Sequence, residues 1–315
     1  MPTSNLHRLV LALALGGLFS HSVLAAQAQP AASQASATPA ATKPVRILAS
    51  LPITYGLGQI LLKDTGVVLE RAAAANLPGS RQSAYFTGRG AEALHRLATD
   101  ADAVIGLRSI WGEDSLYPNA RRSNIRIVEI DAARPVDGAL PGVALQAGQG
   151  IDGLNSQPWL ASHNLGRMAD VLSADLVRLA PEAKPRIEAN LAAFKQQLLT
   201  LSADSEKRLA QADNVAVVSL SDRLNYLISG LNLELVERQV LTDEQWTPAA
   251  LQKLTTTLKD NEVAVVLDHR EPPAPVKAAI SAAGSQLLVL GSENDDPLAG
   301  LQQDVDLLLK ALTKG

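Results

Sequence analysis

The chain offers few residues that could hold a bare metal ion. It has no cysteine, so thiolate ligands, thiol nucleophiles and disulfides are excluded. Of its five histidines, His163 stands at a predicted helix start, and His269 follows a predicted strand beside Asp268 and near Glu271. Two imidazoles and a carboxylate are enough for a weak site. Because the two histidines come from separate segments that no motif joins, we treat them only as candidate ligands of a rearranged metal site.

Catalytic motifs are missing from the sequence. It contains no Gly-x-Ser-x-Gly elbow, no phosphate-binding loop and no paired metal motif. The segment GRGAE (88–92) does not match the dinucleotide fingerprint, which needs three spaced glycines after a strand. The sequence therefore predicts that the protein is not an enzyme.

Cations and aromatic residues follow several of the predicted strands. They are Arg81, Tyr85, Arg89, Arg108 and Trp111 in the first half of the chain, and Arg223, Tyr226 and Arg270 in the second. The guanidinium fork suits carboxylate or catecholate oxygens, and aromatic faces pack against flat organic molecules. These residues favour a cleft for an anionic organic ligand, such as a metal–siderophore complex. The alternative interpretation is that most of them are solvated loop cations and packing aromatics.

Eight short apolar runs rich in β-branched residues or leucine indicate the strands that would position these side chains. They are residues 45–50, 66–72, 102–107 and 125–130, then 214–220, 233–237, 262–268 and 285–290. Most lack clean alternation, which is typical of strands buried on both faces of a parallel sheet. Because ligands bind beyond the carboxyl ends of such strands, two facing sheets would form a cleft between them.

The middle of the chain carries helical patterns and no strand signal. Leucines repeat at helical spacing after Asn164, and Pro181 opens a second pattern through Ile187, Leu191 and Phe194. A helix of thirty residues would span ~45 Å. We therefore predict an α/β fold with two lobes, each with a four-stranded, mainly parallel sheet flanked by helices, joined by a long bridging helix.

The first residues read as an export signal. His7 and Arg8 precede a short apolar run (9–19), and small residues follow at 23–28. The run is too short for a mature membrane span, although an uncleaved anchor is the alternative. Residues 27–43 are rich in Ala, Ser, Pro, Gln and Thr, a composition typical of disorder. We expect a periplasmic protein whose mature form does not span the membrane.

The predicted organisation covers the whole chain, whose length favours two domains. It comprises a signal peptide (1–26), a disordered linker (27–43), an N-terminal α/β lobe (44–163), a helical segment with the bridging helix (164–211) and a C-terminal α/β lobe (212–315). The 28 basic and 32 acidic residues nearly balance, and no basic block is present. Nucleic acid is therefore not an expected partner.

This plan resembles the periplasmic solute-binding proteins of zinc, manganese and iron ABC transporters. Residues 45–61 look like the family's first strand and helix, and 180–201, with Asn190, look like its bridging helix. Trp159, Leu160 and Asn164 match the family's Asp-Pro-His-x-Trp-Leu-Asp-Pro segment and the asparagine that follows it.

The resemblance places other residues where the family has its metal ligands. Gln157 stands in place of one histidine, and Gln82 in place of a second. Ser221, with Ser219 and Asp222 beside it, stands near the third, and Glu293 is close to the final carboxylate. An amide oxygen is a poor ligand for Zn²⁺ compared with imidazole. The scaffold is kept, but the expected ligand changes.

The resemblance therefore implies a role in metal uptake. We expect the cleft to bind a metal in chelated form, such as an iron–siderophore, for delivery to an ABC permease or a second periplasmic binding protein. No other cofactor is expected. One alternative is an interaction module that docks such a partner without any small ligand. Another is a binder of free Zn²⁺ or Mn²⁺ through a rearranged site.

Overall fold

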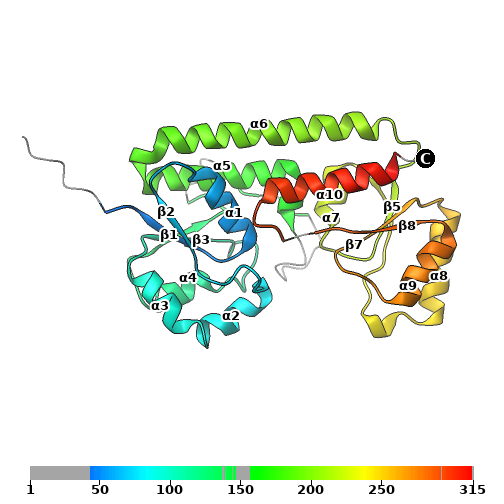
Figure 1. Ribbon diagram of the computed structural model, residues 1–315, viewed down its shortest axis with the longest axis horizontal. Helices are drawn as coiled ribbons and strands as arrows, with labels where there is room; N and C mark the ends of the chain where they lie inside the picture. The colour runs from blue at the N-terminus through cyan, green and yellow to red at the C-terminus, as the bar shows by residue number, and fades with distance from the viewer. Residues whose placement is uncertain are drawn as a thin grey trace, which may run out of the picture. The chain divides into compact units, whose positions relative to one another are not determined.

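The computed structural model describes residues 43–136, 138, 140–143, 145–146, 157–291 and 293–313 (Figure 1). The predicted signal peptide, and the linker up to residue 42, lie outside the described residues. Residues 43–315 form one compact unit that contains both predicted lobes. No helix in the described part of the chain is long and apolar enough to cross a membrane.

Each lobe is built on one sheet, and all eight predicted strands are present. The strands are β1 (Arg46–Ala49), β2 (Val68–Arg71), β3 (Ala103–Gly106) and β4 (Val128–Asp131) in the N-terminal lobe, and β5 (Ala216–Ser219), β6 (Glu234–Arg238), β7 (Val265–Asp268) and β8 (Gln286–Val289) in the C-terminal lobe. All pairs are parallel, in the orders β2-β1-β3-β4 and β6-β5-β7-β8. The predicted fold class is confirmed.

The burial of the strands explains why their sequences do not alternate. Every residue of the inner strands β3, β5 and β7 is buried, because helices cover both faces of each sheet. In both sheets the order reverses direction beside the first strand, between β1 and β3 and between β5 and β7. Such switch points place a ligand crevice beyond the strand ends.

Short helices flank the sheets. In the N-terminal lobe they are α1 (Pro52–Leu61), α2 (Gly79–Thr87), α3 (Ala91–Thr99) and α4 (Leu116–Ala120); in the C-terminal lobe they are α7 (Asn225–Gly230), η4 (Asp243–Gln245), α8 (Pro248–Asp260) and α9 (Ala274–Ala283). Thr247 caps α8 through the amide of Ala250, as the Thr-Pro start predicts.

The lobes are joined by long helices. After η2 (Pro158–Leu160) the chain forms α5 (Ser162–Leu179), η3 (Pro181–Ala183) and α6 (Lys184–Leu209), and the last helix is α10 (Pro297–Leu312). The 26 residues of α6 extend over ~39 Å, and the helix runs above both lobes in Figure 1. Asn190 fastens α6 to the end of α1, since its side-chain amide donates to the carbonyls of Leu61 and Lys63 at 3.0 and 2.8 Å.

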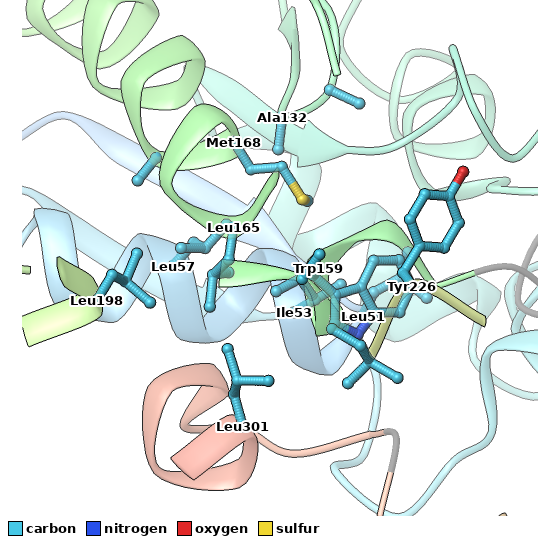
Figure 2. Close-up of a cluster of buried hydrophobic side chains, with 14 of the residues drawn as sticks. Leu51, Ile53, Leu57, Ala132, Trp159, Leu165, Met168, Leu198, Tyr226 and Leu301 are labelled. Atoms are coloured by element: carbon cyan, nitrogen blue, oxygen red, sulfur yellow. The ribbon is translucent and has the colours of Figure 1, made fainter. Parts of the chain in front are cut away.

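One hydrophobic cluster is shared by the lobes and the helical segment. Figure 2 shows side chains of α1, η2, α5, α6, α7 and α10 meeting around Trp159, which is 7% exposed. Leu51 and Ile53 come from the N-terminal lobe, and Tyr226 comes from the C-terminal lobe. Trp159 is therefore a packing residue between the lobes.

Candidate functional site

The three residues that the resemblance places at the family's histidine positions are buried. Gln157 is 0% exposed, Gln82 is 3% exposed and Ser221 is 0% exposed. The Gln82 amide donates to the Ser50 carbonyl at 3.1 Å, which ties α2 to the loop after β1. The Ser221 carbonyl accepts from the Ser219 hydroxyl at 2.6 Å. Amide and hydroxyl groups therefore occupy these places, and each of these two contacts stays within its own lobe.

Between the lobes lies an inner cavity of about 20 Å³. Its walls include Leu51, Ile53, Trp159, Leu160 and Leu301, so they are largely apolar. A volume of 10–15 Å³ is about what one water molecule needs. The inner cavity therefore has room for a single water and none for an organic chelate.

A larger hollow, which we call the mouth, adjoins the inner cavity through shared residues. It measures about 410 Å³ and is lined by Pro52, Asn76, Leu77, Glu293, Asn294 and Asp295, together with Ala75 and Pro78. Residues 75–78 follow β2, and residues 293–295 follow β8. Drug-sized ligands occupy pockets of ~300–1,000 Å³. Of these two hollows, only the mouth is large enough for an organic ligand.

The charges around the mouth are paired. Arg71 reaches Asp295 at 2.5 Å, and Arg223 reaches Glu293 at 3.4 Å. The Arg71 guanidinium also lies over the Tyr55 ring, 4.1 Å from its centroid. The mouth thus combines two amides with two compensated carboxylates.

A buried carboxyl group lies next to Gly291, just after β8. Asp304 on α10 is 4% exposed, and its Oδ1 accepts from the Gly291 amide at 3.1 Å. Its Oδ2 has no hydrogen-bond partner within the described part of the chain. Burial raises the pKa of Asp304 to about 7, although the Gly291 hydrogen bond opposes this rise. Asp114, which accepts from the amides of Leu107 and Leu116, has a pKa raised by burial to about 6.

The structure does not gather the predicted arginines around one ligand position. Arg108 pairs with Glu129 at 3.0 Å, and Arg270 pairs with Asp243 at 2.7 Å. Arg89 lies 5.7 Å from the centroid of the Tyr85 ring. These contacts are formed within single lobes. Only Arg223, through Glu293, is connected to the mouth.

Two aromatic candidates also pack within their own lobes. Trp111 is 4% exposed and packs in the hydrophobic core. A bulky apolar ring at the end of a strand gains more from burial than from exposure. Tyr85 covers Gly90, where an added Cβ would lie 2.3 Å from the ring.

The two candidate histidines belong to different elements. His163 is exposed at the start of α5, and His269 is half-buried after β7, with its Nδ1 3.2 Å from Asp268. Among the described residues, no group of three or more His, Cys, Asp or Glu could hold a metal ion.

Sequence reasoning missed Arg71, Tyr55, Asn76, Asn294 and Asp295. A usable signal was present, since 72–78 and 290–296 both follow predicted strands, where ligands of such folds bind. Ser292, which precedes Glu293, lies outside the described residues.

A match to a family profile establishes the family of the chain. The profile described as zinc-uptake complex component A, periplasmic, matches residues 89–313. The chain belongs to this family. The members of this zinc-uptake component A family are periplasmic, non-enzymatic, solute-binding components of metal ABC transport systems. The predicted family and the prediction that the protein is not an enzyme are confirmed.

Solved structures share the fold at low identity. An FpvC mutant from Pseudomonas aeruginosa is 21% identical with a TM-score of 0.67, over 86% of this chain and 100% of that one. ZnuA is 18% identical with a TM-score of 0.64, over the same shares. The ZnuA-like domain of Streptococcus pneumoniae AdcA is 18% identical with a TM-score of 0.63, also over 86% and 100%. A comparison with curated proteins gave no match.

Proposed function

We propose that the chain is the solute-binding component of a metal ABC transport system and carries its metal in chelated form, such as an iron–siderophore complex. The observation that carries this proposal is the chemistry of the ligand positions. Gln82, Gln157 and Ser221 are buried and offer amides and a hydroxyl in place of imidazoles. Such groups bind transition metals poorly, whereas a chelator brings its own ligands.

The relatives sharpen this contrast. FpvC has been solved in complexes with Ni²⁺ and Mn²⁺, and the ZnuA-like domain of AdcA has been solved bound to Zn²⁺. The chain keeps their fold but not the histidine set that its resemblance to the family implies. A change of cargo from bare ion to chelate accounts for both facts.

The mouth is the place we propose for the chelate. It measures about 410 Å³, while the inner cavity measures about 20 Å³. Its arginines are already paired with carboxylates, and its remaining polar groups include Asn76 and Asn294. Neutral amides and compensated charges suit a neutral or zwitterionic chelate, such as a hydroxamate complex, better than a polyanionic catecholate.

The experiment is a thermal melt of the purified mature protein with Ga³⁺ complexes of hydroxamate, carboxylate and catecholate chelators. A bound chelate at ~100 times its Kd stabilises by about 2.7 kcal/mol, a rise in Tm of several degrees. Ala75→Trp should fill the mouth and abolish the rise. Ala282→Trp, on the exposed surface of α9, is the control and should keep it. A rise that survives Ala75→Trp would place the ligand elsewhere.

A second candidate function is an interaction module that docks an ABC permease or a second periplasmic binding protein without a small ligand. The apolar inner cavity, with room for one water, favours it. If no chelate raises the Tm while the protein binds its permease or a partner binding protein directly, this candidate replaces the first.

A rearranged site for free Zn²⁺ or Mn²⁺ is tested separately. Calorimetric titration after chelator treatment should show no binding tighter than micromolar. A one-to-one nanomolar site that is lost in His163→Ala or His269→Ala would overturn the proposal of chelated cargo.

Export to the periplasm through a cleaved signal peptide is part of the proposal. N-terminal sequencing of the mature protein should find its first residue near Ala26 or Gln27. An intact Met1 on the protein from the periplasmic fraction would contradict cleavage.

A further inference from the structure

A short connection carries the chain from the C-terminal sheet to the N-terminal lobe. Residues 293–296, which we call the crossing segment, follow β8 and lead into the start of α10. Figure 1 shows the chain leaving β8 in the C-terminal lobe and α10 beginning beside α1 of the N-terminal lobe. Asp295 lies on this segment and also lines the mouth. Contacts of Asp295 with the N-terminal lobe therefore connect the two halves of the molecule.

Arg71 makes the charged part of this contact. It is the last residue of β2, and its side chain is only 14% exposed. Its guanidinium lies over the Tyr55 ring of α1, 4.1 Å from the centroid, and its Nη2 donates to the Asp295 carboxylate at 2.5 Å. The aromatic face fixes the direction of the guanidinium, so its charge meets the carboxylate of the other lobe.

The second part of the contact between the lobes is the close packing of α1 at Gly56 against the crossing segment. An added Cβ at this position of α1 would lie 2.2 Å from the Asp295 carbonyl oxygen and 2.7 Å from Pro297. Both atoms belong to the backbone or a rigid ring, so neither can give way without moving the crossing segment. The close approach of α1 to the crossing segment requires glycine here.

The crossing segment is held by its own lobe as well. Glu293 pairs with Arg223 at 3.4 Å, and the amide of Gly291, which precedes the segment, donates to Asp304. The Asp296 amide donates to Asn294 at 2.9 Å, and the Asp296 side chain caps α10. Asp295 is therefore presented by an ordered backbone rather than by a free loop.

The contact leaves one donor unsatisfied. The Arg71 Nη1 is buried and has no hydrogen-bond partner among the residues that the structure describes. A buried N–H without a partner loses its hydration and gains nothing in return, which offsets part of the ion pair. Separation of the lobes would return this nitrogen to water.

We propose that Arg71 and Asp295 form an inter-lobe latch that positions the crossing segment against α1 and thereby sets the width of the mouth. This inference rests on the proposed function only where it concerns the solute. The latch itself is a property of the ligand-free protein and can be tested without any ligand.

The test measures the distance between the lobes. The chain has no cysteine, so Arg122→Cys on the N-terminal lobe and Lys259→Cys on the C-terminal lobe accept spin labels specifically. Both positions are exposed. Pulsed electron–electron double resonance then gives the distribution of distances between the two labels. We expect Arg71→Ala, Asp295→Asn and Gly56→Ala each to broaden the distribution and shift it from the parent's.

Two controls match the variants. Arg270→Ala removes an ion pair within the C-terminal lobe, and Gly112→Ala adds a Cβ that would meet no atom within 4 Å. Both should leave the distribution unchanged. The exchanged pair Arg71→Asp with Asp295→Arg should restore the parent distribution, because the ion pair is re-formed in reverse.

Unchanged distributions in Arg71→Ala and Gly56→Ala would overturn the latch. Failure of the exchanged pair to restore the parent distribution would also overturn it, since the ion pair would then not be the contact that acts. A failure of the proposed function can be distinguished from a failure of the latch. In that case the latch variants shift the distance between the spin labels, but no Ga³⁺ chelate raises the Tm of the parent. If the latch and the proposed function are both correct, we expect the latch variants to bind the chelate more weakly than the parent does.

Discussion

The inner cavity and the mouth share Pro52, Glu293 and Asn294, yet they have opposite characters. The inner cavity is small and walled mainly by the leucines and tryptophan that join the lobes. The mouth is open, about twenty times larger and lined by amides and carboxylates. The three positions that the resemblance assigns to histidine ligands are buried and neutral, whereas the paired charges lie at the mouth.

This comparison shows that the scaffold of a binding protein can be kept while the side chains that contact its ligand are replaced. The crevice between two parallel sheets is fixed by strand order and bridging helices. What it binds depends on the few side chains at its rim. In this chain the scaffold of the family is kept, while the chemistry at the strand ends is that of amides, hydroxyls and compensated carboxylates.

Replacement of Trp159 tests the packing role of the inner region and should have the largest effect. Trp159→Ala leaves a void in the cluster that both lobes share, so the free energy of unfolding should fall by about 3–5 kcal/mol. Urea denaturation measures it. Asn76→Ala, at the exposed mouth, is the control and should change it by less than about 0.5 kcal/mol. Comparable losses in both variants would mean that the inner region is not the better packed of the two.

Restoration of histidines tests whether the ligand positions converge. The triple variant Gln82→His, Gln157→His and Ser221→His should bind Zn²⁺ one-to-one, with Glu293 as a possible fourth ligand, because three imidazoles and a carboxylate satisfy the ion. We expect at least about 100-fold tighter binding than in the parent by calorimetry, a gain of about 2.7 kcal/mol. The untuned surroundings should keep the affinity ~10–100-fold below that of a native site.

The control is the triple alanine variant, which should bind no Zn²⁺. If the histidine variant binds no more than this control, the three positions do not converge on one point. Ser219→His should then be tried in place of Ser221→His, because Ser219 ends β5 two residues earlier.

The buried carboxyl beneath the crossing segment predicts a pH dependence. The folded protein holds the Asp304 proton more tightly than the unfolded chain does, since the pKa is raised from 3.8 to about 7. Asp304 therefore costs stability increasingly as the pH rises from about 4 to 7, and the loss is complete above 7. Asp304→Asn keeps an acceptor for the Gly291 amide but does not titrate. Relative to this variant, the parent's Tm should fall by roughly 5 °C between pH 5 and pH 8.

Asp306→Asn is the matched control, because Asp306 lies on the same helix but pairs with Arg208 at the surface. Its pH dependence should follow that of the parent. Parallel pH profiles for Asp304→Asn and the parent would show that Asp304 is not the group responsible.

The smallest expected effect concerns lobe motion. The helix α6 runs unbroken along both lobes, and bending it would stretch or break backbone hydrogen bonds (Figure 1). Binding at the mouth should therefore change the radius of gyration by less than about 1 Å in small-angle scattering. A large decrease with the Ga³⁺ chelate that raises the Tm would instead mean that the lobes close as rigid halves about a flexible hinge.

The sequence by itself determined the eight strands, their parallel pairing and the long helices. Runs such as AVVS and AVIG carry no polar residue facing solvent, which is possible only where helices cover both faces of a sheet. The Thr247-Pro248 start and Asp296 mark helix ends through local hydrogen bonds that need no tertiary contact. Burial of Trp159 follows similarly, since a large ring between two predicted lobes gains most by packing.

Only the tertiary structure decided which residues meet at the mouth. Arg71 and Asp295 are separated by 224 positions, and no periodic pattern in the sequence connects them. The same is true of the pairing of Arg108 with Glu129 and of Arg270 with Asp243. Secondary structure is encoded by near neighbours and their spacing, whereas a site at the ends of two sheets depends on long-range packing that places distant loops within a few ångströms of each other.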